Sequence, residues 1–227
     1  TSAAPAVTAP TPESPMFLWI IGDSFVELFG PALRNDSAET GVIESEVDFR
    51  FISGLTRSDY LDWPTHIEQR IPDLDVPDAV TVSFGGNDGQ PILIAGELVD
   101  PDTEPWLAEY HDRVGEVMDL LIDGGVQRVY WIGLPIMRDG DFSERARLYN
   151  SVYAEEAAAR PGVEFVDVYD LFADENGEYS TYLRDSSGDL LIMRYEDGAH
   201  YTWNGAYRLS AFVLEAVAEE WGFTDRL

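Results

Sequence analysis

From Met16 onward, short apolar runs alternate with longer amphipathic stretches. The short runs predict buried β-strands, and the stretches with apolar residues at helical spacing predict α-helices. The expected strands cover residues 17–21, 42–51, 79–84, 128–132 and 164–168, and the expected helices cover residues 25–33, 60–70, 106–123, 144–160 and 203–221. A strand followed by a helix, repeated about five times, predicts a parallel five-stranded sheet covered on both faces, the three-layer α/β/α class.

Two segments depart from this alternation. Residues 1–15 consist mainly of Ala, Pro, Thr and Ser with one charged residue, Glu13, so they are expected to form an extended linker ahead of a single domain, residues 16–227. Such a linker either joins the domain to an upstream anchor or is an ordinary disordered terminus, and the composition leaves both open. Between residues 173 and 194, Asp-Glu-Asn-Gly and Asp-Ser-Ser-Gly-Asp separate short β-like runs, which predicts a hairpin before the last helix.

Acidic residues outnumber basic residues by 43 to 14, which gives a net charge of −29. Such a surface repels phosphate backbones and anionic lipid headgroups, so nucleic acid and membrane surfaces are poor partners. Whether it serves salt tolerance or substrate choice stays open. The absence of cysteine excludes disulfides and thiolate chemistry and suits a bacterial protein that is exported from the cytoplasm. No apolar run reaches the ~18 residues of a membrane span, so direct membrane insertion is not expected.

The first predicted strand ends in Gly22-Asp23-Ser24. Parallel sheets bind ligands at the carboxyl ends of their strands, and the Ser24 hydroxyl is expected to face that crevice. The backbone N–H groups at the start of the following helix would point at an incoming anion. Ser24 is therefore a candidate nucleophile, although a serine at this place alone more often serves as a helix N-cap.

Two further polar segments carry candidate chemistry. Gly85-Gly86-Asn87 follows the third strand, where the glycines permit close approach of a substrate and Asn87 offers an amide donor or takes a left-handed loop conformation. Asp197-Gly198-Ala199-His200 precedes the last helix. An aspartate three residues ahead can hold one ring nitrogen of His200, which leaves the other free as a base.

The order of these blocks resembles the SGNH/GDSL hydrolase superfamily: serine after strand one, Gly54 after strand two, asparagine after strand three, and Asp-x-x-His before the last helix. The resemblance extends over essentially all of residues 16–227. The chain is especially similar to a bacterial cell-envelope branch catalogued as a domain of unknown function, through 58–64, 85–91, 129–135 and 197–202. There is no Gly-x-Ser-x-Gly elbow, which favours the flavodoxin-like SGNH sheet over an α/β-hydrolase.

The resemblance implies a role for each matching residue. Ser24 would attack an ester carbonyl, His200 would act as its base, and Asp197 would orient His200. The N–H groups of Ser24 and Gly54 and the side-chain amide of Asn87 would form the oxyanion hole, because a tetrahedral oxyanion needs preset donors. This chemistry is expected to need neither a metal nor an organic cofactor. The acidic cluster of Asp170, Asp174 and Glu175 lacks the spacing of a calcium loop and is expected to form a turn.

Six other residues are candidates for substrate contact because they lie in or near these loops. Arg57, just beyond Gly54, is the better functional candidate, whereas Trp63 suits structural packing equally well. A rim of aromatic and arginine side chains would suit a carbohydrate ester. The full set is Asp23, Arg57, Trp63, Asp88, Gln90 and Arg138.

The sequence thus predicts an extracytoplasmic bacterial serine esterase that removes small acyl groups, above all acetyl groups, from an envelope glycan or glycolipid. Two alternatives remain. The same Ser-His-Asp triad serves an O-acyltransferase that passes the acyl group to a sugar hydroxyl, and a glycan-binding domain could keep the fold without catalysis.

Overall fold

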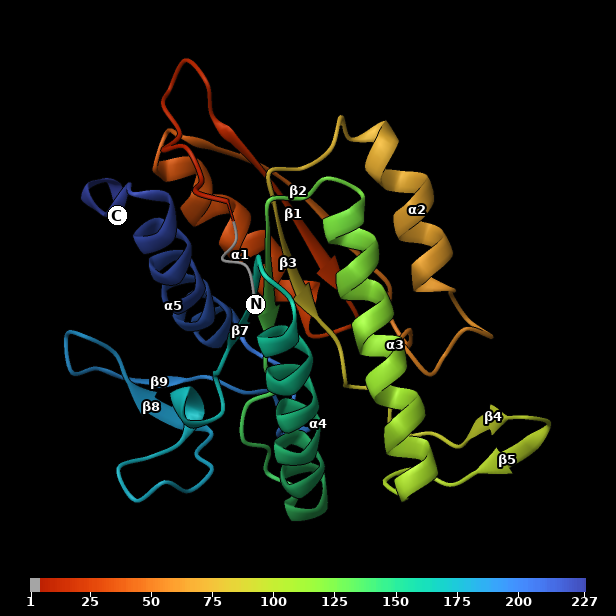
Figure 1. Cartoon of the computed structure of the whole chain (residues 1–227). Helices are drawn as coiled ribbons and strands as arrows, with labels where there is room; N and C mark the ends of the chain where they lie inside the picture. Colours follow the sequence, from red (N-terminus) through yellow and green to blue (C-terminus); the bar gives the residue numbers. More distant parts are fainter. Residues whose placement is uncertain (1–4) are drawn as a thin grey trace.

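The computed structural model describes residues 5–227, and its centre is a five-stranded parallel sheet (Figure 1). The strands lie in the order β2-β1-β3-β6-β7, with every neighbouring pair parallel. This is the flavodoxin-like order, in which the crevice opens between the first and third strands of the sheet. The bounds are β1 Met16–Gly22, β2 Ile43–Phe49, β3 Ala79–Ser83, β6 Arg128–Ile132 and β7 Val163–Val166.

Helices cover both faces of the sheet. On one face α1 packs against α5, and on the other α3 lies between α2 and α4 (Figure 1). The predicted three-layer α/β/α class is therefore confirmed. The helices are α1 Val26–Glu39, α2 Trp63–Asp73, α3 Glu104–Asp123, α4 Gly140–Ala159 and α5 Trp203–Trp221. No helix in the described part of the chain combines the length and the apolarity needed to cross a bilayer.

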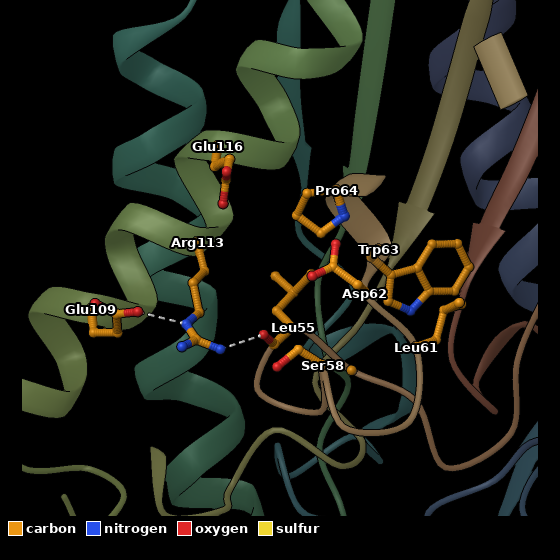
Figure 2. A pocket seen from close by; sticks show the side chains of 10 residues that line it. Leu55, Ser58, Leu61, Asp62, Trp63, Pro64, Glu109, Arg113 and Glu116 are labelled. Atoms are coloured by element: carbon orange, nitrogen blue, oxygen red, sulfur yellow. Dashed lines mark hydrogen bonds and ion pairs between the residues drawn. The ribbon is translucent and has the colours of Figure 1, made fainter. Parts of the chain in front are cut away.

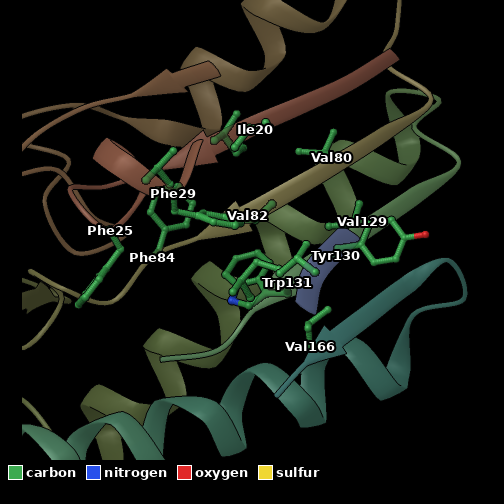
Figure 3. Packing of buried hydrophobic residues seen from close by; sticks show 14 of the residues in the cluster. Ile20, Phe25, Phe29, Val80, Val82, Phe84, Val129, Tyr130, Trp131 and Val166 are labelled. Carbon is green, nitrogen blue, oxygen red and sulfur yellow. The ribbon is translucent and has the colours of Figure 1, made fainter. Parts of the chain in front are cut away.

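The core consists of side chains from the central strands together with the helix side chains that cover them, such as Phe29 of α1 (Figure 3). Every residue of β3 and β6 is buried, and the two indole rings of Trp19 and Trp131 are completely enclosed. Strands that are covered on both faces require apolar residues at nearly every position, which is why these segments appear in the sequence as unbroken apolar runs.

Most predicted elements are confirmed, and the boundaries differ where local chemistry competes with the pattern. Helix α1 continues to Glu39, although Pro31 lies inside it. Strand β2 ends at Phe49, two residues earlier than expected, because the chain turns there and Ile52 takes a left-handed conformation with φ 63°. Helix α2 begins at Trp63 rather than at residue 60. The Asp62 side chain caps this end of the helix by accepting from the Thr65 N–H at 2.9 Å.

Two small hairpins project from the sheet. The expected excursion before α5 contains β8 Tyr182–Arg184 and β9 Leu190–Ile192. A second hairpin, β4 Ile92–Ile94 and β5 Glu97–Val99, was not expected from the sequence, and its two-residue turn places Ala95 and Gly96 at positive φ. Short 3-10 helices cover Asp170–Phe172 and Thr224–Arg226.

The predicted linker is described only from residue 5, since residues 1–4 lie outside the described part. The segment before β1 lies against the domain: the Arg128 guanidinium donates to the Pro5 carbonyl at 2.6 Å, and Val7 packs against the core. Most of residues 5–15 are nevertheless exposed.

Candidate active site

Ser24 lies in the turn between β1 and α1. Its hydroxyl oxygen is 2.8 Å from Nε2 of His200, although 176 residues separate the two in the chain. The alternative role as a helix cap does not hold, because Phe25 is the N-cap of α1 and no side chain caps that end. Gly22 permits this tight turn: a Cβ there would lie 2.0 Å from the Ser83 carbonyl oxygen, and its φ of 153° is one that other residues rarely adopt.

Asp197 forms the turn that presents His200. Its Oδ1 accepts from the N–H groups of Ala199 at 2.9 Å and of His200 at 3.0 Å, and its Oδ2 lies 2.6 Å from His200 Nδ1. Burial raises the pKa of Asp197, but the Ala199 N–H and the His200 ring outweigh it, so the pKa lies below its usual value. An ionised carboxylate only accepts, so Nδ1 carries the proton and Nε2 is free to accept one from Ser24.

The buried guanidinium of Arg194 supports this turn from the interior of the protein. Arg194 is 1% exposed, and it donates to the carbonyls of Ala199 and, at 3.1 Å, Ile136. Its guanidinium carbon lies 4.4 Å from the ring centroid of Phe172 and 4.6 Å from that of Tyr201. Burial lowers the pKa of Arg194. Because the guanidinium binds a carbonyl of the turn, it fixes the backbone immediately before His200.

Asp23 connects the turn after β1 with the turn after β3. Its carboxylate accepts from the Phe25 N–H at 2.9 Å and from the Gly86 N–H at 2.8 Å. Burial raises the pKa of Asp23 to about 7, the two N–H groups oppose that rise, and the nearby carboxylate of Asp88 adds to it. Asp23 is thus a structural link beside the serine rather than a residue exposed to substrate.

The expected oxyanion donors come from the turns after β2 and β3. The Asn87 side-chain amide donates one hydrogen bond to the Ser53 carbonyl at 3.0 Å and lines the same hollow as Ser24. Asn87 is not in the left-handed conformation that the sequence left open. Among the described residues, the N–H groups of Ser24 and Gly54 donate to no other protein group, so both are available to a ligand. Gly54 itself lines a neighbouring pocket rather than this hollow.

Asp88 lies directly behind Gly54. A Cβ on Gly54 would be 2.3 Å from Asp88 Oδ1, so only glycine fits. That oxygen also accepts from the Thr56 N–H at 3.0 Å, and Asp88 Oδ2 accepts from the Tyr110 hydroxyl at 2.8 Å. Burial raises the pKa of Asp88, while the Thr56 N–H opposes the rise. Asp88 therefore braces the loop after β2 from the interior and has no exposed surface for substrate.

The far side of the same loop rests on α3. Figure 2 shows Arg113 reaching from α3 toward the loop, where it donates to the Leu55 carbonyl at 2.9 Å and pairs with Glu109 at 2.9 Å. The small pocket in this view, about 200 Å³, lies between α3 and residues 54–64. The loop that carries Gly54 is thus held from both sides.

Ser24, Asn87, Asp197 and His200 open onto one hollow of about 380 Å³. The sequence analysis missed the rest of its lining. Phe51 was assigned to the second strand, which was expected to cover residues 42–51, but that strand ends at Phe49. Phe51 and the following Ile52 lie at the rim instead, where they are 48% and 50% exposed. Two signals point to the others: Glu27 follows Ser24 by three residues, and Tyr195 precedes Asp197 by two. The missed set is Glu27, Phe51, Ile52 and Tyr195.

None of the six proposed substrate contacts lines this hollow. Asp23 and Asp88 are buried. Arg57 pairs with Asp59, and both Arg57 and the exposed Gln90 line a separate hollow beside the β4–β5 hairpin. The other two have structural contacts: Trp63 is buried and donates to the Ser53 hydroxyl at 3.0 Å, and Arg138 donates to the Glu196 carbonyl. The expected rim of aromatic and arginine groups is thus aromatic without the arginines.

The remaining two histidines lie on helices away from this hollow. His66 contacts Asp48 at 2.7 Å, and His111 contacts Glu156 at 2.7 Å. Across residues 5–227, no group of three or more His, Asp or Glu side chains has an arrangement that would hold a metal ion.

Ser24, Gly54 and Asn87 follow the carboxyl ends of β1, β2 and β3, and His200 lies just before α5. Together with the sheet order, this arrangement is that of the SGNH-type α/β/α class. Within that class the chain belongs to the family described as "Protein of unknown function (DUF459)", whose model matches residues 17–216. The predicted resemblance to a branch of unknown function is thereby confirmed. No curated protein matches the chain.

Solved structures share the fold at low sequence identity. One is a mutant of Axe2, an acetyl-xylooligosaccharide esterase from Geobacillus stearothermophilus, at 16% identity and TM-score 0.62, covering 91% of this chain and 95% of that one. Another is the psychrotrophic esterase EstA from Pseudoalteromonas sp., at 9% identity and TM-score 0.57, covering 89% and 97%. At these identities the similarity establishes the fold.

Proposed function

We propose that this protein is a serine-dependent O-acyl hydrolase with Ser24 as nucleophile, His200 as base and Asp197 as the residue that orients the base. The observation that carries the proposal is the continuous contact from the Ser24 hydroxyl to His200 Nε2 at 2.8 Å and from His200 Nδ1 to Asp197 at 2.6 Å. Serine is a weak nucleophile unless a base is within hydrogen-bond reach, and these distances lie inside that reach.

The reaction follows from this geometry in two halves. Ser24 Oγ attacks the ester carbonyl carbon while its proton passes to His200 Nε2, and the oxyanion accepts from the donors of Ser24, Gly54 and Asn87. Collapse of the tetrahedral intermediate breaks the bond to the alkoxy oxygen, which takes the proton from His200 and leaves as the alcohol. Water then attacks the acyl-serine, gives a proton to His200, and the carboxylic acid departs as Ser24 regains its proton.

The substrates proposed are small acyl esters, chiefly acetate esters on a carbohydrate of the bacterial envelope. A hollow of about 380 Å³ suits a short acyl group, and the exposed rings of Phe51 and Tyr195 offer apolar faces on which a sugar ring can stack. The fold shared with an acetyl-xylooligosaccharide esterase supports the same choice. We propose an extracytoplasmic location, for which fractionation of the native bacterium is the test.

Hydrolysis of p-nitrophenyl acetate by the parent protein and by Ser24→Ala tests the proposal. The parent is expected to release nitrophenol and Ser24→Ala to lose at least about 1,000-fold in kcat. An alkyl fluorophosphonate should add its mass to the peptide that contains Ser24. Equal rates in both proteins, or labelling elsewhere, would overturn the assignment. With a glycan present, appearance of acylated glycan in place of free acid would identify the transferase alternative.

A further inference from the structure

The hollow in front of Ser24 carries negative charge without a basic side chain to balance it. Its lining contains two carboxylates, Glu27 and Asp197, and neither Lys nor Arg. The arginines on adjacent loops are engaged elsewhere: Arg50 pairs with Asp48 at 2.5 Å, and Arg138 donates to the Glu196 carbonyl. A substrate in this hollow therefore meets an electronegative wall.

Of the two carboxylates, only Glu27 is available to a substrate. Asp197 already accepts from two backbone N–H groups and the ring of His200. Among the described residues, the Glu27 carboxylate has no hydrogen-bond or ion-pair partner. Its backbone is fixed relative to the nucleophile, because the Glu27 N–H donates to the Ser24 carbonyl at 3.2 Å. Glu27 is thus a free acceptor three residues from the serine.

Two aromatic rings accompany this carboxylate. Phe51 and Tyr195 line the same hollow and are 48% and 47% exposed. Aromatic faces attract cations and stack on sugar rings, and a carboxylate binds ammonium groups and hydroxyls, whereas both repel an anion. The three side chains therefore all favour a cationic or uncharged substrate over an anionic one.

On the basis of the proposed esterase function, we propose that the hollow selects its ester by charge and that Glu27 is the specificity-determining residue. Esters whose alcohol part is an uncharged polyol or carries an ammonium group are substrates. Esters whose alcohol part carries a carboxylate, sulfonate or phosphate are rejected. Among envelope glycans, this assigns acyl groups on neutral or amino sugars rather than on acidic sugars.

Glu27 also stands in the first turn of α1, where a negative charge stabilises the helix. That role affects the stability of the protein and is independent of substrate charge. The two roles are separable, because only contact with the substrate makes the ratio of rates for cationic and anionic esters depend on this side chain. Screening gives a second readout, since the Debye length shrinks to about 3 Å at 1 M salt.

The experiment measures kcat/KM for acetylcholine, its uncharged analogue 3,3-dimethylbutyl acetate, and 2-sulfoethyl acetate. The quantity of interest is the ratio of the acetylcholine value to the 2-sulfoethyl acetate value, in the parent protein and in Glu27→Gln. Comparing this ratio between proteins cancels the intrinsic reactivity of the esters. Glu39→Gln is the matched control, because Glu39 is exposed at the other end of α1, about 18 Å along the axis.

Glu27→Gln is expected to lower the ratio about tenfold at low ionic strength. The reason is that kcat/KM for acetylcholine falls and kcat/KM for 2-sulfoethyl acetate rises, each by up to about fivefold. In the parent protein the ratio should fall toward the Glu27→Gln value in 1 M salt, and Glu39→Gln should match the parent. A ratio that Glu27→Gln leaves unchanged, or that both variants lower equally, would overturn the inference alone. No hydrolysis of 3,3-dimethylbutyl acetate by the parent would overturn the proposed function together with it.

Discussion

The carboxylate of Asp23 accepts a hydrogen bond from the N–H of Gly86 at 2.8 Å. Asp23 immediately precedes Ser24, and Gly86 immediately precedes Asn87, so this bond joins the turn of the nucleophile to the turn of the amide donor. Strands β1 and β3 are neighbours in the sheet, but pairing alone does not fix the turns beyond their ends. The buried carboxylate supplies that constraint.

Replacing Asp23 with Asn should alter the pH dependence of stability. The pKa of Asp23 rises from 3.8 to about 7 on folding through burial, so between these values the folded chain keeps a proton that the unfolded chain has lost. The free energy of unfolding therefore falls as pH rises from about 4 to about 7, by at most ~1.4 kcal/mol per pH unit from this group, and levels off above. Asp23→Asn, neutral throughout, should flatten that decline in urea unfolding curves. An unchanged slope would show that another group causes it.

Asn87→Ala should lower kcat about 100- to 1,000-fold, because it removes one of the proposed oxyanion donors. KM should change little, since the donor acts on charge that develops after binding. The bond from Asn87 to the Ser53 carbonyl is also lost, so thermal unfolding of the variant must be measured alongside the kinetics. A rise in KM with kcat intact would assign Asn87 to substrate binding instead.

Gly54→Ala should impair both stability and activity. The added methyl group would lie 2.3 Å from Asp88 Oδ1, and that oxygen is itself held by the Thr56 N–H. We expect overpacking to lower the free energy of unfolding by about 1–3 kcal/mol. We also expect kcat to fall because the Gly54 N–H is displaced. Denaturant unfolding and p-nitrophenyl acetate hydrolysis measure the two effects. Gly140→Ala is the control for a glycine substitution, because a Cβ there meets nothing within 4 Å and Gly140, like Gly54, has no positive φ. Activity equal to that of the control would remove Gly54 from the oxyanion hole.

Arg194→Met should reduce kcat by loosening the turn that presents His200. Methionine fills part of the space between Phe172 and Tyr201, but the Ala199 carbonyl loses its donor, which costs about 1–3 kcal/mol. Arg208→Met is the matched control, since Arg208 donates to the Leu171 carbonyl at 2.9 Å and does not contact the turn. Both variants should lose stability, and only Arg194→Met should lose kcat at constant KM. Equal kinetic losses in the two variants would indicate a purely structural role.

The sheet was predictable because β3 and β6 are buried at every position and therefore leave continuous apolar runs in the sequence. The end of α1 was not, because residues 34–39 are mostly polar and the pattern alone does not show that packing against α5 carries the helix to Glu39. Tertiary contacts outweigh local propensity there.

The approach of Ser24 and Asn87 was foreseeable, since topology brings the carboxyl ends of β1 and β3 to one edge of the sheet. The approach of His200, which follows no strand of the sheet, was expected only from the family resemblance. The remaining lining was not foreseeable. Loop side chains such as Arg57 and Phe51 follow the direction of individual turns, which strand order does not determine. The left-handed turn at Ile52 brings Phe51 to the hollow, while Arg57, a few residues later, pairs with Asp59 outside it.

The side chains of Asp197 and His200 are 47% and 36% exposed, so the proposed base and the carboxylate that orients it both lie beside bulk water. In the proposed reaction, the departing alcohol and acid would reach the solvent without the movement of any segment, and water would reach the acyl-serine equally freely. We therefore expect bond making and breaking, rather than product exit, to limit turnover, and we expect the alcohol part of the ester to extend beyond the hollow.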